Sequence, residues 1–274
     1  MSWRKKKKEI GKIKHKAILI ICLMFAVVIG LFVLLVFKLI NTGTNYYKVE
    51  SRIEELKNEK PIENTSFRSI GWLKVQGTEI DLPIVYSDKQ GEAFPVQLES
   101  FGWAKSKFNK NSTFYDITGH NIFNLSATPK IKSSMFNRFE QLMAFIYYDF
   151  AKNNEYIQLT VDDEDYVFKI FAVSFIERGL TTFYNVEENA SKAKKEEIIE
   201  TLKEESIYKY DVDVNADDKI ISLSTCTRFY GVDGDVEFYV AGRLVRDDEN
   251  INHYRVIKDN KYEKIEKKLK GDEQ

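Results

Sequence analysis

The stretch EYIQLTVDDEDYVFKIFAVSFI, from Glu155 to Ile176, decides the fold class. Two runs rich in β-branched and aromatic residues flank the turn-forming residues 162–165, a pattern typical of two antiparallel strands joined by a short turn. About seven or eight such strands in roughly 180 residues favour one β-barrel or sandwich over two domains. The other strand-like runs are WLKV at 72–75, IDLPIVY at 80–86, KIISLSTC at 219–226 and VEFYVAGRLV at 236–245.

Helices are expected before this β pattern and within it. Residues 46–60 place Val49, Ile53 and Leu56 at helical spacing, and Pro61 follows as a stop. Apolar residues also recur at helical spacing over 134–143 and 187–206, and the many charges of the second segment indicate a solvated face. The fold is therefore expected to be mainly β with added helices.

The N-terminus combines a basic block with a long apolar run. Residues 1–16 carry eight basic side chains and one acid, and residues 17–37 hold no polar or charged side chain over 21 positions. That length reaches across the hydrocarbon core of a bilayer as a helix, whereas the apolar core of a cleaved signal peptide usually has about 7–15 residues. We expect an uncleaved single-span anchor with a cytoplasmic N-terminus and an exterior domain, and a signal peptide is the alternative.

The balance of charges also changes after the apolar run. The formal net charge is -1, but residues 41–274 hold 32 basic and 41 acidic side chains. This acidic exterior portion argues against nucleic-acid binding. The expected organisation is a cytoplasmic basic segment at 1–16, a transmembrane helix at 17–40, an N-terminal helical segment at 41–67, a catalytic β-barrel domain at 68–246 and a charged, mobile C-terminal tail at 247–274, in which a terminal helix is the alternative.

Two residues of the exterior portion indicate thiol chemistry. Cys22 falls in the apolar run as a filler, so Cys226 is the single cysteine outside it, and His120 lies in a β-like run that ends in a loop. A thiolate is a strong nucleophile, and a neighbouring imidazole both stabilises it and moves protons. The alternatives are a buried inert cysteine and a histidine in a turn.

The sequence lacks the residue patterns of zinc sites, nucleotide-binding loops and serine hydrolases. One cysteine and one central histidine do not make a zinc site, and CxxC and HExxH spacings are absent from the sequence. Glycine-rich nucleotide loops and a GxSxG serine signature are absent as well. No cofactor and no metal are therefore expected.

Several motifs together resemble those of the sortases. Ser222–Cys226 (SLSTC) is similar to their TLxTC signature, and Thr118–Asn121 (TGHN) is similar to their catalytic-histidine segment about a hundred residues upstream. Residues 71–75 (GWLKV) resemble the opening of their barrel. The N-terminal helix, the SMF run at 134–136 and the long helix before the cysteine strand resemble class B specifically. The resemblance covers roughly residues 45–246.

This resemblance implies a closed β-barrel of about eight strands and a cysteine transpeptidase on the outer face of a Gram-positive membrane. Cys226 would form a thioester with a secreted protein at its C-terminal sorting signal, and His120 would act as the acid and base. An amine of a peptidoglycan precursor or a pilin would then accept the acyl group. The alternatives are a cysteine hydrolase and a non-catalytic surface scaffold or adhesin with the same fold.

The catalytic arginine of the family has no direct counterpart. In the family it lies five residues before a small residue such as Ala241, and here that position is Val236. Arg243 lies seven residues further along, about 23 Å in an extended strand. Arg228, two residues after Cys226, is the expected substitute, and a solvent-exposed loop arginine is the alternative.

Overall fold

The computed structural model describes residues 21, 23–25, 27–34, 66–89, 101–119, 138–180, 187–227, 229–231, 235–249 and 251–271. The chain forms two compact units, Met1–Lys48 and Val49–Gln274. The described residues of the first unit are helical. Among the described residues, none of the helices has both the length and the apolar character that a membrane crossing requires. The helix expected at 46–60 lies outside the described residues.

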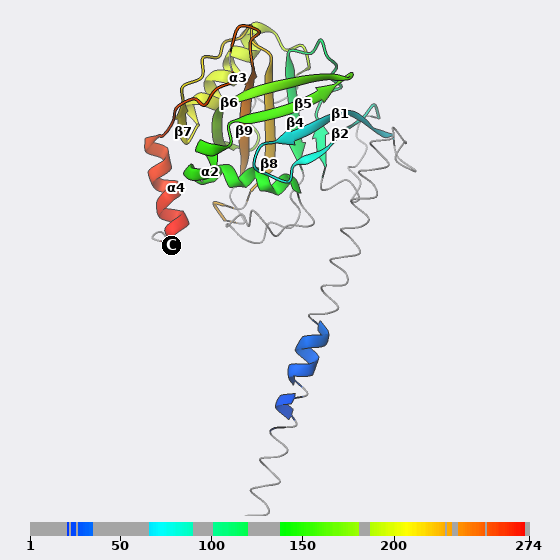
Figure 1. Ribbon diagram of the computed structural model, residues 1–274, viewed down its shortest axis with the longest axis vertical. Coiled ribbons are helices and arrows are strands. Elements are labelled where there is room, and N and C mark those ends of the chain that lie inside the picture. The colour runs from blue at the N-terminus through cyan, green and yellow to red at the C-terminus, as the bar shows by residue number, and fades with distance from the viewer. Residues whose placement is uncertain are drawn as a thin grey trace, which may run out of the picture. The chain divides into compact units, whose positions relative to one another are not determined.

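The second unit is built on a closed barrel, which confirms the expected fold class (Figure 1). In the described part of the chain, eight strands follow one another around it in the order β1-β2-β3-β4-β8-β9-β6-β5. Neighbours are antiparallel except for β2–β3 and β4–β8, which are parallel. The strands are β1 (Phe67–Val75), β2 (Asp81–Ser87), β3 (Gly102–Ala104), β4 (Phe114–Gly119), β5 (Tyr156–Val161), β6 (Glu164–Glu177), β8 (Ile220–Cys226) and β9 (Val236–Leu244).

The hairpin β5–β6 has the tight turn that its sequence predicts. Val161 pairs with Glu164, so only two residues form the loop. Asp162 and Asp163 have φ values of 49° and 61°. A two-residue turn with positive φ at both positions matches the twist of the flanking strands, and aspartate tolerates this region better than most residues. The acidic pair therefore fixes the register of the longest strand in the barrel.

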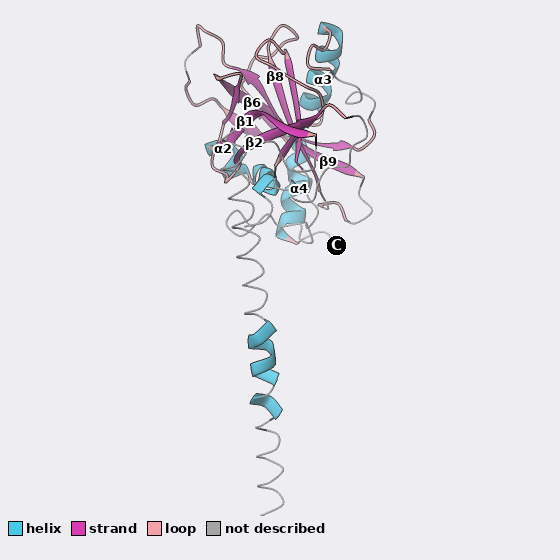
Figure 2. Ribbon diagram, turned by 90° about the vertical axis from the view of Figure 1, so that its right-hand side faces the viewer, coloured by secondary structure: helices cyan, strands magenta, loops and turns pink. Residues whose placement is uncertain are grey.

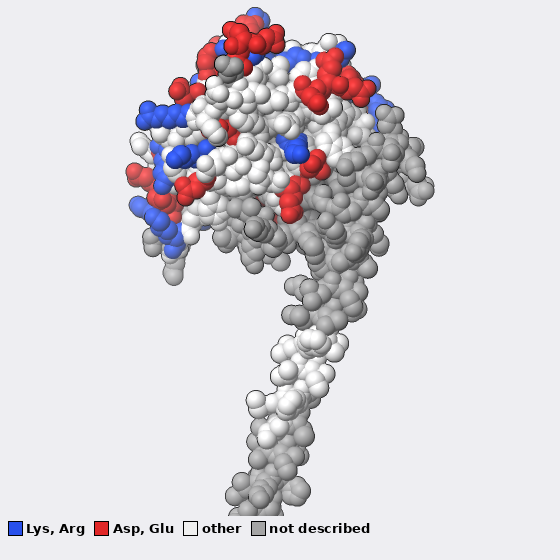
Figure 3. Space-filling model, viewed as in Figure 1, with Lys and Arg blue, Asp and Glu red and all other residues white. Residues whose placement is uncertain are grey.

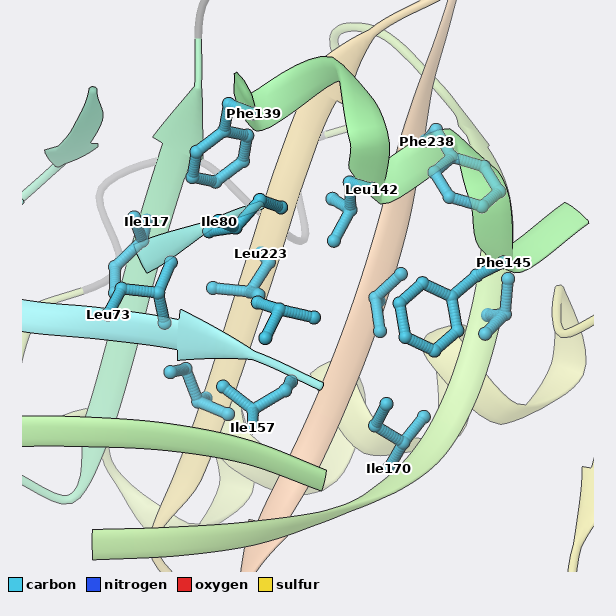
Figure 4. Close-up of a cluster of buried hydrophobic side chains, with 14 of the residues drawn as sticks. Leu73, Ile80, Ile117, Phe139, Leu142, Phe145, Ile157, Ile170, Leu223 and Phe238 are labelled. Carbon is cyan, nitrogen blue, oxygen red and sulfur yellow. The ribbon is translucent and has the colours of Figure 1, made fainter. Parts of the chain in front are cut away.

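The barrel interior is filled by alternate side chains of the strands and closed at one end by a 3-10 helix, η2 (Arg138–Ile146). Figure 4 shows aromatic and aliphatic side chains of η2 directed at those of the strands. All of them are fully buried, so the closure removes a large apolar surface from water. The labelled residues of this cluster are Leu73, Ile80, Ile117, Phe139, Leu142, Phe145, Ile157, Ile170, Leu223 and Phe238.

Two helices differ in extent from the sequence prediction. In the segment expected to be helical at 134–143, the described residues form η2, which continues to Ile146 and is followed by the short helix α2 (Tyr148–Asn153). The helix expected at 187–206 is α3 (Lys192–Glu204), because the hydroxyl of Ser191 accepts a hydrogen bond from the Lys194 backbone N–H at 3.2 Å and caps the first turn.

Helix α3 covers part of the outer face of the barrel. Its buried residues Ile198, Ile199 and Leu202 join a second apolar cluster with outward-facing side chains of β6, β8 and β9. Figures 1 and 2 place α3 near the upper end of the unit, and α2 and the C-terminal helix near the lower end. The outer face of β4, β8 and β9 is therefore shielded at one end, where Ile220 and Phe114 lie.

The C-terminal region differs from the mobile tail expected at 247–274. Strand β10 (Val256–Lys258) pairs with β7 (Tyr208–Tyr210), and helix α4 (Asn260–Lys270) follows. The Asp259 carboxylate accepts the Lys261 backbone N–H at 3.1 Å at the helix start. Tyr262 and Ile265 are buried against the barrel core. The few apolar residues of this charged segment fall on one helical face, which is why it packs despite its composition.

Replacing Ile265 by alanine is expected to lower the free energy of unfolding by about 2–4 kcal/mol, because it opens a cavity under α4. The matched control is Lys264→Ala on the exposed side of the same helix, which should change stability by less than about 0.5 kcal/mol. Urea unfolding followed by tryptophan fluorescence measures both. Equal, near-zero effects of the two substitutions would show that α4 does not contribute to the stability of the barrel.

Opposite charges are interspersed over the described surface in the view of Figure 3. Several form exposed ion pairs, such as Lys110 with Glu164 at 2.9 Å and Lys258 with Glu266 at 2.8 Å. Exposed pairs of this kind typically contribute no more than about 1 kcal/mol each. The barrel is therefore stabilised mainly by its two apolar clusters, and buried charges are the exceptions that require an explanation.

Candidate active site

Cys226 is the last residue of β8, and its position follows from the alternation of that strand. Ile221 and Leu223 point into the barrel core, so Ser222, Ser224 and Cys226 belong to the opposite, outer face. Cys226 is half-buried. Burial raises the pKa of its thiol above the ordinary value, because desolvation disfavours the thiolate. A reactive thiolate at this position needs compensation from a neighbouring cation.

The parallel pairing of β4 with β8 brings the two sequence motifs together. Thr118 pairs with Ser224 and Gly119 with Thr225, and the hydroxyl oxygens of Thr118 and Ser224 lie 2.8 Å apart. Gly119 with Thr225 is the last described pair of the two strands, and Cys226 is the next residue of β8. His120, the residue after Gly119 in the sequence, lies outside the described residues.

Gly119 has a packing reason for being glycine. A Cβ added at this position would fall 1.9 Å from ring atoms of Phe139, which lies in η2. No side chain fits at that distance, so a larger residue would push η2 away from the end of β4. The glycine of the TGHN segment therefore lets the helix that closes the barrel approach the strand that leads to His120.

Two charged residues that the sequence analysis missed lie near Cys226. Glu237 pairs directly with Cys226 across β8 and β9. Arg178 follows β6, and its Nε lies 3.7 Å from Glu237 Oε1 and 3.6 Å from Asp235 Oδ1. The positive charge of Arg178 lowers the pKa of the Cys226 thiol, and the negative charge of Glu237 raises it. No sequence motif marked them, because their proximity depends on strand pairings between distant segments.

The predicted arginine Arg228 lies outside the described residues. Arg243 is described, and it is remote from the thiol: it pairs with Ile220, at the opposite end of β8 from Cys226. Its guanidinium is buried and forms an ion pair with Glu249. This confirms the sequence-based exclusion of Arg243 from the site, and it assigns that residue to the stability of the barrel.

A polar row continues from Cys226 along the outer face. Tyr239 donates its hydroxyl hydrogen to Glu237 Oε2 at 2.8 Å, which fixes the carboxylate opposite Cys226. Further along, Lys105 Nζ lies 3.1 Å from the buried carboxylate of Asp116, whose pKa is nevertheless raised because desolvation outweighs the lysine. The thiol thus lies at one end of a sheet surface on which polar side chains hold one another in place.

The loop after Cys226 is supported by the C-terminal helix. Phe229 stacks on Phe175 with ring centroids 5.2 Å apart, and Tyr230 meets the same ring edge-on at 5.1 Å. Lys268 of α4 lies 5.5 Å and 5.2 Å from the centroids of Phe229 and Tyr230. These cation–π distances are within the favourable range. Helix α4 therefore contributes to positioning the segment that immediately follows the thiol.

The described residues of this site fit thiol chemistry. Within the described ranges, histidine, cysteine and acidic side chains do not gather in groups of three that would suit a metal ion. A half-buried thiol beside a guanidinium and a carboxylate is instead suited to nucleophilic attack on a carbonyl, because the cation offsets the cost of forming the thiolate.

Among known proteins, no protein-family model matches the chain, but a curated relative and solved structures are similar to it. Sortase B of Listeria monocytogenes is 29% identical over 160 residues, a match that covers 57% of this chain and 62% of that protein. The match therefore spans less than two thirds of the relative's length.

Solved structures of sortases share the fold. Sortase B from the type II pilus of Streptococcus pneumoniae aligns with a TM-score of 0.52 and 20% identity over 71% of this chain and 97% of its own. Sortase B of Staphylococcus aureus aligns with a TM-score of 0.51 and 15% identity over 75% of this chain and 97% of its own. Sortase B of Clostridium perfringens aligns with a TM-score of 0.50 and 21% identity over 72% of this chain and 100% of its own. The chain thus has the fold of the class B sortases and is similar in sequence to sortase B.

Proposed function

We propose that the protein is a class B-like sortase, a cysteine transpeptidase in which Cys226 is the nucleophile and His120 the acid and base. The observation that carries the proposal is the β4–β8 register, whose last described pair is Gly119 with Thr225. In the sequence, His120 follows Gly119, and Cys226 follows Thr225. Because consecutive Cα atoms are only about 3.8 Å apart, this pairing of the two sequence motifs supports a shared site for them.

The proposed reaction has two acyl-transfer steps. The Cys226 sulfur attacks a peptide carbonyl carbon in the sorting signal, a C–S bond forms, and the C–N bond breaks as His120 gives a proton to the leaving amine. An incoming amine then loses a proton to His120 and attacks the thioester, so that a C–N bond forms and the thiolate leaves. Arg228 remains a predicted donor to the substrate or to the oxyanion.

The cellular setting is part of the same proposal. The basic residues 1–16 and the apolar run at 17–37 support a single-span anchor with a cytoplasmic N-terminus and the barrel outside the cell. The substrates would be secreted proteins with a C-terminal sorting signal, and the acceptor an amine of a peptidoglycan precursor or a pilin. A position at the cell envelope brings both within reach of a tethered enzyme.

A transfer assay with the full chain in detergent micelles tests the proposal. The protein is incubated with a library of peptides that carry varied five-residue sorting motifs, first alone and then with a short glycine peptide as the amine. We expect mass spectrometry to show an acyl adduct on Cys226 in the first case and an amide-linked product in the second. Only free acid in both would indicate a cysteine hydrolase, and no adduct with any peptide would favour a non-catalytic scaffold.

A further inference from the structure

The outer face around Cys226 joins three strands in one row. Cys226 pairs with Glu237 on β9, and Glu237 pairs with Ile176 on β6. Paired residues in antiparallel strands share a face, so these three side chains lie on the same side of the sheet. Arg178 is two residues after Ile176, and its backbone N–H donates to the carbonyl of Asp235 at 2.8 Å, which continues the ladder. Alternation returns Arg178 to the face of Cys226.

The guanidinium of Arg178 forms ion pairs with residues of the neighbouring chain segment 235–237, which lies between β6 and the strand that carries the thiol. Its ion pairs with described residues are both made through Nε, to Asp235 and to Glu237. Glu237 is held in turn by the hydroxyl of Tyr239. Since Glu237 lies directly opposite Cys226, its ion pair with Arg178 holds the guanidinium over β9, the strand next to the one that carries the thiol.

The remaining N–H groups of this planar fork have the right chemistry for a developing oxyanion. Arginine carries five N–H donors, and donors aimed at the charge that forms in acyl transfer are among the largest contributions to catalysis. The side chain is 48% exposed, so a bound peptide can reach it. Arg178 also favours the thiolate of Cys226, whereas burial and Glu237 oppose it.

We infer that Arg178, which directly follows β6 and is positioned by Glu237, is the guanidinium that serves Cys226 and the substrate carbonyl. It compensates for Val236 at the position where the family has its arginine. This inference rests on the proposed transpeptidase function for its catalytic part. Its electrostatic part concerns the thiol alone and holds whether or not a substrate is found.

Two measurements on the full chain in detergent, in a Cys22→Ala background, test the inference separately. The first is the rate of iodoacetamide labelling of Cys226 against pH, which reports the thiol pKa without any substrate. The second is kcat/KM for transfer of a sorting peptide to a glycine peptide. Arg178→Gln is expected to move the labelling midpoint to higher pH and to lower kcat/KM by about 100-fold. Glu237→Gln should move the midpoint to lower pH and yet also lower kcat/KM, because it releases the arginine.

Three comparison variants sharpen the outcome. Arg178→Lys should restore most of the labelling midpoint but not the transfer rate, because lysine keeps the charge and loses the fork. Arg68→Gln removes a comparably exposed arginine of β1, which is paired with Asp88 just after the end of β2, and should change neither measurement. The inference is overturned if Arg178→Gln leaves the midpoint unchanged, or if Arg228→Gln shifts both measurements while Arg178→Gln shifts neither. Absence of transfer in every variant, with the midpoint shift intact, would instead remove the proposed function.

Discussion

Replacing Cys226 by alanine is expected to abolish adduct formation and to reduce transfer by at least about 1,000-fold, because no other group in the proposed mechanism forms the thioester. The fold should survive, since Cys226 is half-buried at the end of β8 and lies outside both apolar clusters. Loss of one sulfur atom there should cost no more than about 1 kcal/mol of unfolding free energy. Peptide transfer assays and urea unfolding measure the two effects on the same preparation.

The matched control is Cys22→Ala, which removes the other cysteine of the chain and leaves the barrel untouched. It should retain full transfer activity. Unfolding of the barrel in Cys226→Ala would mean that the thiol is a structural core residue. Retained transfer in Cys226→Ala would mean that another group is the nucleophile.

Strongly patterned segments made much of the barrel predictable from the sequence. The β5–β6 hairpin combines two long runs rich in β-branched and aromatic residues with an Asp-Asp turn, and β8 and β9 are long enough to be recognised as strands. Strands β3, β7 and β10 have three residues each, too few for any periodicity to stand out. Strand β3 forms between β2 and β4, and β7 and β10 pair with each other although they are distant in the sequence. Such pairings between backbone groups are information that no local stretch contains.

The candidate site likewise contains a residue that the sequence predicts and a residue that it does not. Cys226 was identified because its motif and the scarcity of cysteine are local and visible in the sequence. Arg178 was missed because nothing around it marks a site: it lies 48 positions before Cys226 and becomes its neighbour only through the pairing of β6 with β9 and of β9 with β8. A residue that acts across two strand pairings requires the three-dimensional register.

Replacing Glu249 by glutamine is expected to lower the free energy of unfolding at pH 7 by about 3 kcal/mol. Glu249 neutralises two buried cations: Arg243, 1% exposed, whose Nη2 lies 3.0 Å from Oε1, and Lys169, 7% exposed, whose Nζ lies 2.5 Å from the same oxygen. Glutamine keeps the size but leaves both charges uncompensated in a poorly solvated site, which is costly. Urea unfolding of the variant and of the unmodified protein gives the difference.

The pH dependence of that difference identifies its origin. The hydrogen bond from Arg243 lowers the pKa of Glu249 to about 2, against burial, which raises it. A carboxyl whose pKa is lower in the folded protein stabilises it fully above its ordinary value of 4.5, and this contribution is lost as the pH falls toward about 2. The gap between the unmodified protein and Glu249→Gln should therefore narrow steadily on acidification below pH 4.5.

The matched control is Glu266→Gln, which breaks the exposed pair with Lys258 and should cost less than about 0.5 kcal/mol at any pH. Because Arg243 pairs with Ile220, at the far end of β8 from Cys226, the labelling midpoint of the thiol should be unchanged in Glu249→Gln. A shifted midpoint would show that the two ends of the outer face are coupled. A pH-independent stability gap would place the effect in packing rather than in the compensation of buried charge.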